Sequence, residues 1–332
     1  MQKVLFIFAL LALSACTYEV NLDELQIVWT SWKQYFGKSY TLSEEAARFA
    51  IFIENYKYIV ETNAAQSDIK LALNKFADIT PTEFSNVYAG GYKRNGKPMQ
   101  VVKNNQNKFY SFRLPKLPAE VDWRTQGAVT PVKDQGQCGS CWAFSTTGVL
   151  EGFYFINNGK LLSFSEQQIV DCDTDQDEGC NGGLPLNALQ YTAQNGLQLE
   201  SDYPYTAIDG TCAYKKRKAY NTNKNYKAIT TQSADDLKAA LVNGPVSIGI
   251  EADQKVFQFY SSGVIKKNCG DDLDHAVLAV GYTTINKDEA FIVKNSWGTS
   301  WGQDGYVYIS TDGKANKGNG VCGILGEPIV PI

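Results

Sequence analysis

Residues 135–144 read Q-G-Q-C-G-S-C-W-A-F, and the 332-residue chain contains a single histidine, His275. A cysteine acts as a nucleophile in its thiolate form, so an efficient one needs a group that removes its proton. Imidazole is the usual base because its pKa lies near the operating pH. If Cys141 is the nucleophile, His275 is therefore the one histidine of the sequence that can serve it.

Cys141 also stands at the start of a long apolar-periodic stretch, residues 141–157, which predicts a helix. The N–H groups and the dipole at a helix N-terminus favour an anion, so we expect the pKa of this thiol to be lowered to roughly 3.5–7.5. Two alternatives stay open. Cys138 and Cys141 could form a redox pair of the thioredoxin type, although such pairs belong in a βαβ setting that this sequence does not predict. His275 could be an ordinary core histidine, although it follows Asp274 and opens an apolar strand.

Length and composition predict a globular protein. The length allows two or three structural units at ~100–200 residues each. With 44% hydrophobic and 20% charged residues, the chain can bury a large core. Residues 1–113 carry 13 Lys and Arg against 10 Asp and Glu, whereas residues 114–332 carry 18 against 25. A basic segment before an acidic body predicts that the two pack together, and the acidic body argues against a nucleic-acid partner.

The N-terminus has the pattern of a secretory signal peptide, which we place at residues 1–16. One early lysine precedes an apolar run over residues 4–13 and then small residues. The run is too short for a membrane span, and no later stretch is apolar enough, so we expect no stable membrane association. Residues 13–16 (L-S-A-C) also resemble a bacterial lipoprotein cleavage box, which would make Cys16 a lipid attachment point.

Removing Cys16 with the signal peptide leaves seven cysteines, an odd number for an oxidising compartment. Three disulfides would leave one thiol without a bridge. That thiol could be a nucleophile, a buried inert cysteine or part of an intermolecular bridge. The parity alone does not identify it.

The chain divides near residue 114. Before it we predict helices over residues 22–36 and 43–62, a strand over 69–78, a helix start at 80–83 and a polar, basic linker over 90–108. Ser43 is the expected N-cap of the second helix, because Glu44 and Glu45 follow it.

Residues 114–332 change from a helical to a strand-rich pattern. Helical periodicity covers residues 141–157, 165–170 and 186–195, and strand patterns cover 246–250, 275–282, 290–295 and 305–310. This order indicates an α+β fold with a cleft between its two halves as the expected site.

The chain resembles the papain family of cysteine peptidases, and most closely its cathepsin L-like members. The resemblance covers nearly the whole chain and rests on several motifs in order: D-W-R at 122–124, G-A-V-T-P-V-K at 127–133, the Cys141 segment, C-N-G-G at 180–183, D-H-A-V at 274–277 and N-S-W-G at 295–298. It implies a papain-like two-lobed fold, with a helical left lobe and a β-barrel-like right lobe, preceded by a helical inhibitory prosegment.

The first unit matches the prosegment motifs of this family. The matching residues are Glu44, Arg48, Phe52, Asn55, Ile59 and Asn63, followed by Asn74, Phe76 and Asp78. The resemblance therefore implies a signal peptide at residues 1–16, an inhibitory propeptide at 17–113 and a mature peptidase domain at 114–332. We call residues 17–113 the prosegment and residues 114–332 the body.

The same resemblance implies roles for individual residues. Cys141 would be the nucleophile and His275 its base, then the acid for the leaving amine; Asn295 would orient the imidazole, shielded by Trp297. Gln135 would donate to the oxyanion, although on its own it could be an ordinary loop residue. No metal or cofactor is implied. The implied disulfides are Cys138–Cys180, Cys172–Cys212 and Cys269–Cys322, which would leave Cys141 as the odd thiol.

The resemblance also implies a substrate cleft. Gly183 would pair with the substrate backbone, and the second subsite would be lined by Leu184, Pro185, Gly249, Leu273 and Ala276, with Trp297 beside the catalytic pair. These walls favour Leu, Phe or Tyr. Glu327, five residues after Cys322, falls at the far end of this pocket, where a carboxylate could pair with arginine. It could equally be a solvated residue near the C-terminus.

The implied activity is endopeptidase cleavage of proteins and peptides by a monomer, made as a zymogen in the secretory pathway and destined for a lysosome, a food vacuole or the exterior. Its own propeptide and cystatin-type inhibitors would be its inhibitory partners. A carboxydipeptidase mode would need a second histidine, and the sequence has none. Other classes to test are a thiol–disulfide oxidoreductase and a binding protein that keeps the fold; the released prosegment could also inhibit in trans. We expect acid to release the prosegment, with cleavage near residues 110–117.

Overall fold

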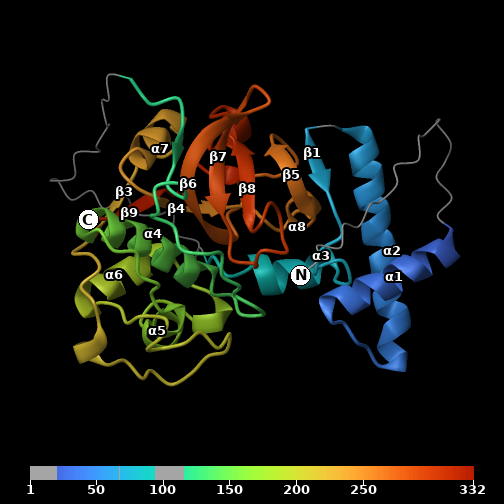
Figure 1. Ribbon diagram of the computed structural model, residues 1–332, viewed down its shortest axis with the longest axis horizontal. Helices are drawn as coiled ribbons and strands as arrows, with labels where there is room; N and C mark the ends of the chain where they lie inside the picture. The colour runs from blue at the N-terminus through green and yellow to red at the C-terminus, as the bar shows by residue number, and fades with distance from the viewer. Residues whose placement is uncertain (1–20, 67, 94–115) are drawn as a thin grey trace.

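The computed structural model describes residues 21–66, 68–93 and 116–332. The predicted signal peptide and lipoprotein box, and most of the predicted linker and cleavage region, lie outside these ranges. Within them, a body with a helical part and a sheet-rich part carries the prosegment helices at one side (Figure 1). No helix in the described ranges is long and apolar enough to cross a bilayer.

The prosegment begins with two helices, α1 (Leu22–Phe36) and α2 (Leu42–Ala65). They meet through aromatic side chains: the rings of Trp29 and Trp32 stack with centroids 5.2 Å apart, and both contact Phe52. Asn21 caps α1 by accepting from the Asp23 N–H, and Gly37 ends it in the left-handed conformation (φ 64°), which glycine adopts without strain.

Two predictions for the prosegment were wrong in detail. The N-cap of α2 is Thr41 and not Ser43, because Thr41 and Glu44 form a capping box, and the helix continues to Ala65. The strand predicted over residues 69–78 is only β1 (Ile69–Leu71). Asn74 ends the extended segment, since its side chain accepts from the Phe76 N–H and its carbonyl from the Ala77 N–H.

The helical lobe of the body consists of α4 (Cys141–Asn158), α5 (Glu166–Cys172) and α6 (Pro185–Asn195), with short 3₁₀ turns η2 (Gly179–Asn181) and η3 (Lys216–Lys218). The first three turns of α4 are buried on all sides, because the helix lies between the two lobes. Disulfides join Cys138 to Cys180 and Cys172 to Cys212 in this lobe. These are the pairs that the resemblance implied.

The second lobe is built on a strongly bent sheet. Its strands are β2 (Val121–Asp122), β3 (Tyr226–Ala228), β4 (Val246–Ile250), β5 (Tyr260–Ile265), β6 (His275–Ile285), β7 (Asp288–Lys294), β8 (Tyr306–Ser310) and β9 (Ile329–Pro331). Strand β6 pairs antiparallel with both β4 and β7, and its first residue lies opposite Ile250. Helices α7 (Ala234–Leu241) and α8 (Lys255–Gln258), the 3₁₀ turns η4 (Ala315–Gly318) and η5 (Val321–Gly323), and the Cys269–Cys322 bridge complete the lobe.

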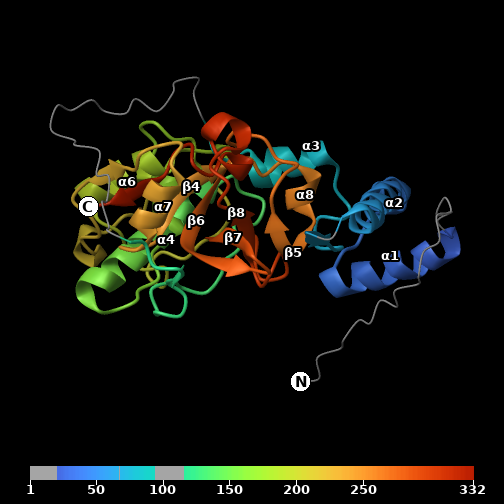
Figure 2. The same ribbon diagram turned by 90° about the horizontal axis from the view of Figure 1, so that it is seen from above.

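The prosegment continues this sheet. Strand β1 pairs antiparallel with β5, with Ile69 opposite Gly263, and the strand order runs β1-β5-β8-β7-β6-β4-β9-β3. Both views place α1 and α2 beyond this edge, with β5 and α8 facing them (Figures 1 and 2). After β1, helix α3 (Pro81–Phe84) and a π-helical turn η1 (Ser85–Ala89) lead toward the cleft. Thr80 and Glu83 form a capping box at the helix start that the sequence predicted over residues 80–83.

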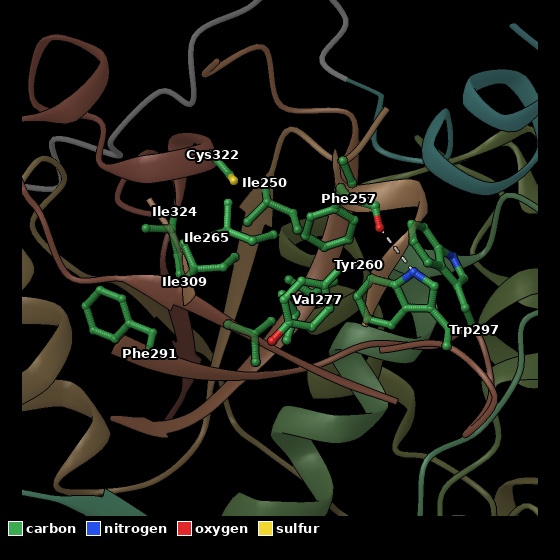
Figure 3. Packing of buried hydrophobic residues seen from close by; sticks show 14 of the residues in the cluster. Ile250, Phe257, Tyr260, Ile265, Val277, Phe291, Trp297, Ile309, Cys322 and Ile324 are labelled. Carbon is green, nitrogen blue, oxygen red and sulfur yellow. Dashed lines mark hydrogen bonds between the residues drawn. The ribbon is translucent and has the colours of Figure 1, made fainter. Parts of the chain in front are cut away.

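One apolar cluster joins the prosegment to the sheet lobe. It extends from Ile265 and Ile309 in the sheet to Phe257 and Trp297 at its edge (Figure 3). Trp297 then contacts Phe76 and Phe84 of the prosegment edge-on, with ring centroids 5.5 and 5.2 Å away. The prosegment is therefore packed as part of the core and is not merely laid on the surface.

Candidate active site

Cys141 is the first residue of α4 and lies between the lobes. Its side chain is fully buried, and it is the only cysteine of the described ranges outside a disulfide. The thiol interacts with the backbone N–H groups of Trp142 and of Ala276, the residue that follows His275. Helix α4 from one lobe and strand β6 from the other thus bring the predicted nucleophile and base to one place.

His275 is held by Asn295, as the resemblance implied. The His275 Nε2 and the Asn295 Oδ1 are 2.8 Å apart, and the Ser296 N–H donates to the same oxygen. Because an amide oxygen can only accept, Nε2 carries the proton. The other ring nitrogen, Nδ1, has no hydrogen-bond partner among the described residues, so it is the ring atom that can accept a proton. The Trp297 ring stacks on the imidazole at 4.7 Å and covers the pair, in the shielding position that we expected.

Gln135, six residues before Cys141, joins the Cys138 segment to Ser296. Its Oε1 accepts from the Ser296 hydroxyl at 2.7 Å, so its amide nitrogen points the other way, toward the Cys138 carbonyl at 3.0 Å. The backbone also fixes it, since the Gln135 N–H donates to the Ser296 carbonyl and its own carbonyl accepts from the Tyr205 hydroxyl. A fully buried amide group with this orientation is suited to donate to an oxyanion next to Cys141.

The expectation of a lowered thiol pKa was wrong for this form of the protein. Burial raises the pKa of Cys141 to about 12, and burial lowers the pKa of His275 to about 4. The reason is the prosegment: a side-chain carbon on Gly91 would lie 3.0 Å from the Cys141 Sγ, so the backbone there covers the thiol. In the covered site, burial therefore disfavours the charged form of each group, the Cys141 thiolate and the His275 imidazolium.

Residues 91–93 of the prosegment run through the cleft like a bound peptide. The Gly183 N–H donates to the Gly91 carbonyl at 3.0 Å, and the Lys93 N–H donates to the Gly183 carbonyl at 3.3 Å. On the other side, the Tyr92 N–H donates to the Asp274 carbonyl at 3.1 Å. Gly183 therefore binds peptide backbone here, as predicted of it toward a substrate. The prediction of a linker beginning at residue 90 was wrong at Tyr92, which is buried in the body.

The predicted second subsite surrounds the Tyr92 side chain. Tyr92, Leu273 and Ala276 form one buried cluster with Cys141, and Leu184 packs against it. Gly249 lies against the Tyr92 ring, and Glu327 accepts from its hydroxyl. Pro185 begins α6 behind Leu184, and its place in the pocket wall stays a prediction.

The geometry agrees with what comparison to known proteins finds. Residues 117–332 match the model of the papain family cysteine proteases. The chain belongs to this family. Residues 29–84 match the cathepsin propeptide inhibitor domain, so this papain-family cysteine endopeptidase is made as a proform that its own prosegment inhibits.

Relatives match over the whole proform. The KDEL-tailed cysteine endopeptidase CEP2 of Arabidopsis thaliana is 40% identical over 345 aligned residues, which cover 100% of this chain and 95% of the relative. Vignain of Ricinus communis is 41% identical with the same coverage. Among solved structures, the proform of the ragweed pollen allergen Amb a 11 is 34% identical with a TM-score of 0.86, covering 94% of this chain and 95% of that one. Digestive procathepsin L 3 of Tenebrio molitor is 36% identical with a TM-score of 0.80, covering 92% and 98%.

Replacing Gln135 by alanine is expected to lower kcat of this papain-family enzyme by roughly 10²–10³-fold with little change in KM, because one oxyanion donor is lost. Peptide hydrolysis by the acid-processed variant measures both constants. Gln135→Glu is the matched control: it can still accept from Ser296 but offers no amide donor, so it should be as slow as alanine. An unchanged kcat in either variant would remove Gln135 from the oxyanion site.

Sequence reasoning missed the groups that hold the Gly183 loop. The Asp177 carboxylate accepts from the Leu184 N–H and from the Asn187 side chain, both at 2.9 Å. A side-chain carbon at Gly183 would lie 2.8 Å from the Asp177 Cβ, so only glycine fits. Burial raises the pKa of Asp177 and of its neighbour Asp173, and contact with Asp177 raises the pKa of Asp173 further. Acidic residues in a turn gave no signal that distinguished these two from solvated ones.

Proposed function

We propose that this enzyme enters the secretory pathway, is released from its prosegment by acid, and cleaves peptides that carry a bulky apolar residue or arginine in the second subsite. The observation that carries the proposal is the Cys141–His275–Asn295 arrangement with residues 91–93 bound in its cleft. Its destination would be a lysosome, a vacuole or the exterior.

The experiment that tests it is acidification of the full-length zymogen, followed by hydrolysis of fluorogenic peptides with Phe-Arg and Arg-Arg before the reporter, with and without an epoxide thiol trap. Cleavage that the trap abolishes supports the proposal. A correctly processed, folded protein that cleaves neither peptide would favour a binding protein of the same fold. Reduction of a model disulfide instead would point to an oxidoreductase, which the bridge between Cys138 and Cys180 disfavours because it leaves Cys141 without its partner.

Ion pairs between the prosegment and the body support the proposal that acid releases the prosegment. Ion pairs join the prosegment to the body at Lys75–Asp134, Lys93–Glu178 and Asp68–Lys266, with separations of 2.6, 2.8 and 3.5 Å. Each carboxylate is well exposed, so each pair contributes at most about 1 kcal/mol, and the three act together. Within the prosegment, the Arg48 hydrogen bond lowers the pKa of Glu83. A lowered folded-state pKa gives stability above the ordinary carboxyl value of about 4.3 that is lost as pH falls through the folded value.

We therefore predict that processing accelerates as the pH falls below about 5 and that the new N-terminus lies within residues 110–117. N-terminal sequencing of the acid-treated product checks the boundary. Lys75→Gln and Lys93→Gln together should move the onset to higher pH, because two of the pairs are removed. A product that begins within residues 20–90 would contradict the domain boundary, and a pH-independent rate would contradict the electrostatic mechanism.

Glu327→Gln is expected to lower cleavage after Arg-Arg relative to Phe-Arg by about tenfold, because a charge-assisted hydrogen bond to the guanidinium becomes a neutral one. The ratio of kcat/KM for the two peptides, measured at one pH on the acid-processed enzyme, checks it. The matched control is Glu178→Gln, which neutralises an exposed carboxylate of the cleft rim outside the pocket. An unchanged ratio in Glu327→Gln would remove arginine from the accepted residues.

A further inference from the structure

The prosegment supplies its own occupant for the second subsite. Tyr92 retains only 7% of its surface, although it comes from a stretch whose neighbours are polar and basic. The backbone is fixed on both sides, because Gly91 and Lys93 bond Gly183 and the Tyr92 N–H donates to the Asp274 carbonyl. The Tyr92 side chain lies in the pocket with Leu273 and Ala276. The Tyr92 ring therefore shows which kind of side chain this pocket accommodates.

The pocket walls are matched to an aromatic ring. A side-chain carbon on Gly249 would lie 3.1 Å from the Tyr92 Cζ and 3.2 Å from its hydroxyl, so the absence of a side chain at residue 249 makes room for the ring tip. The same carbon would lie 3.1 Å from Leu273, which belongs to the same buried cluster as Tyr92. These contacts are apolar and would accept phenylalanine as well as tyrosine.

The end of the pocket distinguishes tyrosine from phenylalanine. The Tyr92 hydroxyl donates to the Glu327 Oε2, and Glu327 retains only 7% of its surface. A buried carboxylate needs a donor, and a hydrogen bond to a charged group is roughly twice as strong as one between neutral groups. A site that pairs a buried polar group with a ligand hydroxyl discriminates strongly against the analogue that lacks it.

We propose that the second subsite selects tyrosine over phenylalanine through Glu327, and that Tyr92 locks the zymogen by making this same contact. The inference rests on the proposed function, in which this pocket receives the substrate residue before the one at the scissile bond. The proposed function admits a bulky apolar residue or arginine in this pocket. The present inference adds a preference for a side chain whose ring carries a neutral hydrogen-bond donor, the tyrosine hydroxyl.

Three peptides that differ at one atom or group test the selection without changing the protein: Tyr-Arg, Phe-Arg and O-methyl-Tyr-Arg before the same reporter. On the acid-processed enzyme, kcat/KM for Tyr-Arg should exceed that for Phe-Arg by about tenfold, which corresponds to about 1.4 kcal/mol. The methyl ether keeps the ring but cannot donate, so it should be no better than Phe-Arg. Equal rates for all three would overturn the selection while leaving the peptidase intact, whereas no hydrolysis of any peptide would overturn the proposed function as well.

Variants then assign the effect to Glu327. Glu327→Leu should bring the Tyr/Phe ratio to about one, and Glu327→Gln, which still accepts through its amide oxygen, should keep part of it. In the zymogen, Tyr92→Phe should speed acid processing several-fold. Tyr88→Phe is the matched control, because it removes a hydroxyl from the same prosegment that bonds Gln137 outside the pocket. A Tyr/Phe ratio unchanged in Glu327→Leu, or equal processing rates for the two tyrosine variants, would overturn the assignment.

Discussion

His275→Ala is expected to lower kcat/KM for peptide hydrolysis by about 10⁴-fold or more. The chain has no second histidine, and the Nδ1 atom of His275 is buried without a hydrogen-bond partner among the described residues. Without it, the site loses the imidazole that takes the proton of Cys141 and returns it to the leaving amine. The rest of the cleft would still bind substrate, so KM should change far less than kcat.

The measurement needs an enzyme freed of its prosegment, which the variant cannot remove by itself. Immobilised wild-type enzyme, filtered off afterwards, can process it in trans. Asn295→Ala serves as the graded control, because the base remains but loses the hydrogen bond that fixes its tautomer. It should be slower than wild type and faster than His275→Ala. If the histidine variant kept more than about one hundredth of the activity, another base would have to serve Cys141.

Lys133→Met is expected to destabilise the folded protein by about 3–5 kcal/mol. The Lys133 ammonium donates to Glu151 at 3.0 Å and to Glu166 at 2.6 Å, and both carboxylates are almost completely buried between the lobes. Burial already raises the pKa of Glu166, and burial lowers the pKa of the neighbouring Lys294 to about 8. Removing the shared cation would leave two buried acids facing each other with only hydroxyl and amide donors.

Denaturant unfolding of the Cys141→Ser proform, which cannot digest itself, measures this loss. How the loss of stability depends on pH follows from the carboxyl groups of Glu151 and Glu166. Without Lys133 their folded-state pKa values rise above the ordinary carboxyl value, so the loss should be largest at neutral pH and should shrink as pH falls toward about 4. Lys218→Met is the control, because its partner Asp202 lies in an exposed pair worth at most about 1 kcal/mol. Equal losses in the two lysine variants would mean that water reaches the buried cluster.

The sequence predicted the residues that need particular chemistry. Cys141 and His275 were predicted from their residue types, and Asn295 followed from the family resemblance. Strand β4 was correctly predicted over residues 246–250 because its alternation is undisturbed. What it could not predict were choices decided by packing. Thr41 caps α2 ahead of Ser43 because its partner Glu44 sits three residues on, and both residues are acceptable caps in isolation.

Tyr92 is the clearest case. A basic, glycine-rich stretch with a single aromatic residue predicts a linker. Tyr92 is buried only because residues 183, 249, 273 and 327, which are distant in the sequence, surround it. The prediction of a lowered pKa for the Cys141 thiol was wrong for the same reason. A helix N-terminus lowers it, but the prosegment backbone over Cys141 removes water, and the cost of desolvation exceeds the gain from the helix.

The pairing of β1 with β5 has a consequence for the protein after processing. A sheet edge that loses its neighbour presents unpaired N–H and C=O groups to any other chain. Once the prosegment leaves, β5 becomes such an edge at Tyr260, Ser262 and Gly263, the residues that pair with β1 in the proform. Each processed molecule therefore exposes a new edge to which another strand can add. Self-association through this edge would begin at high concentrations of freshly processed enzyme.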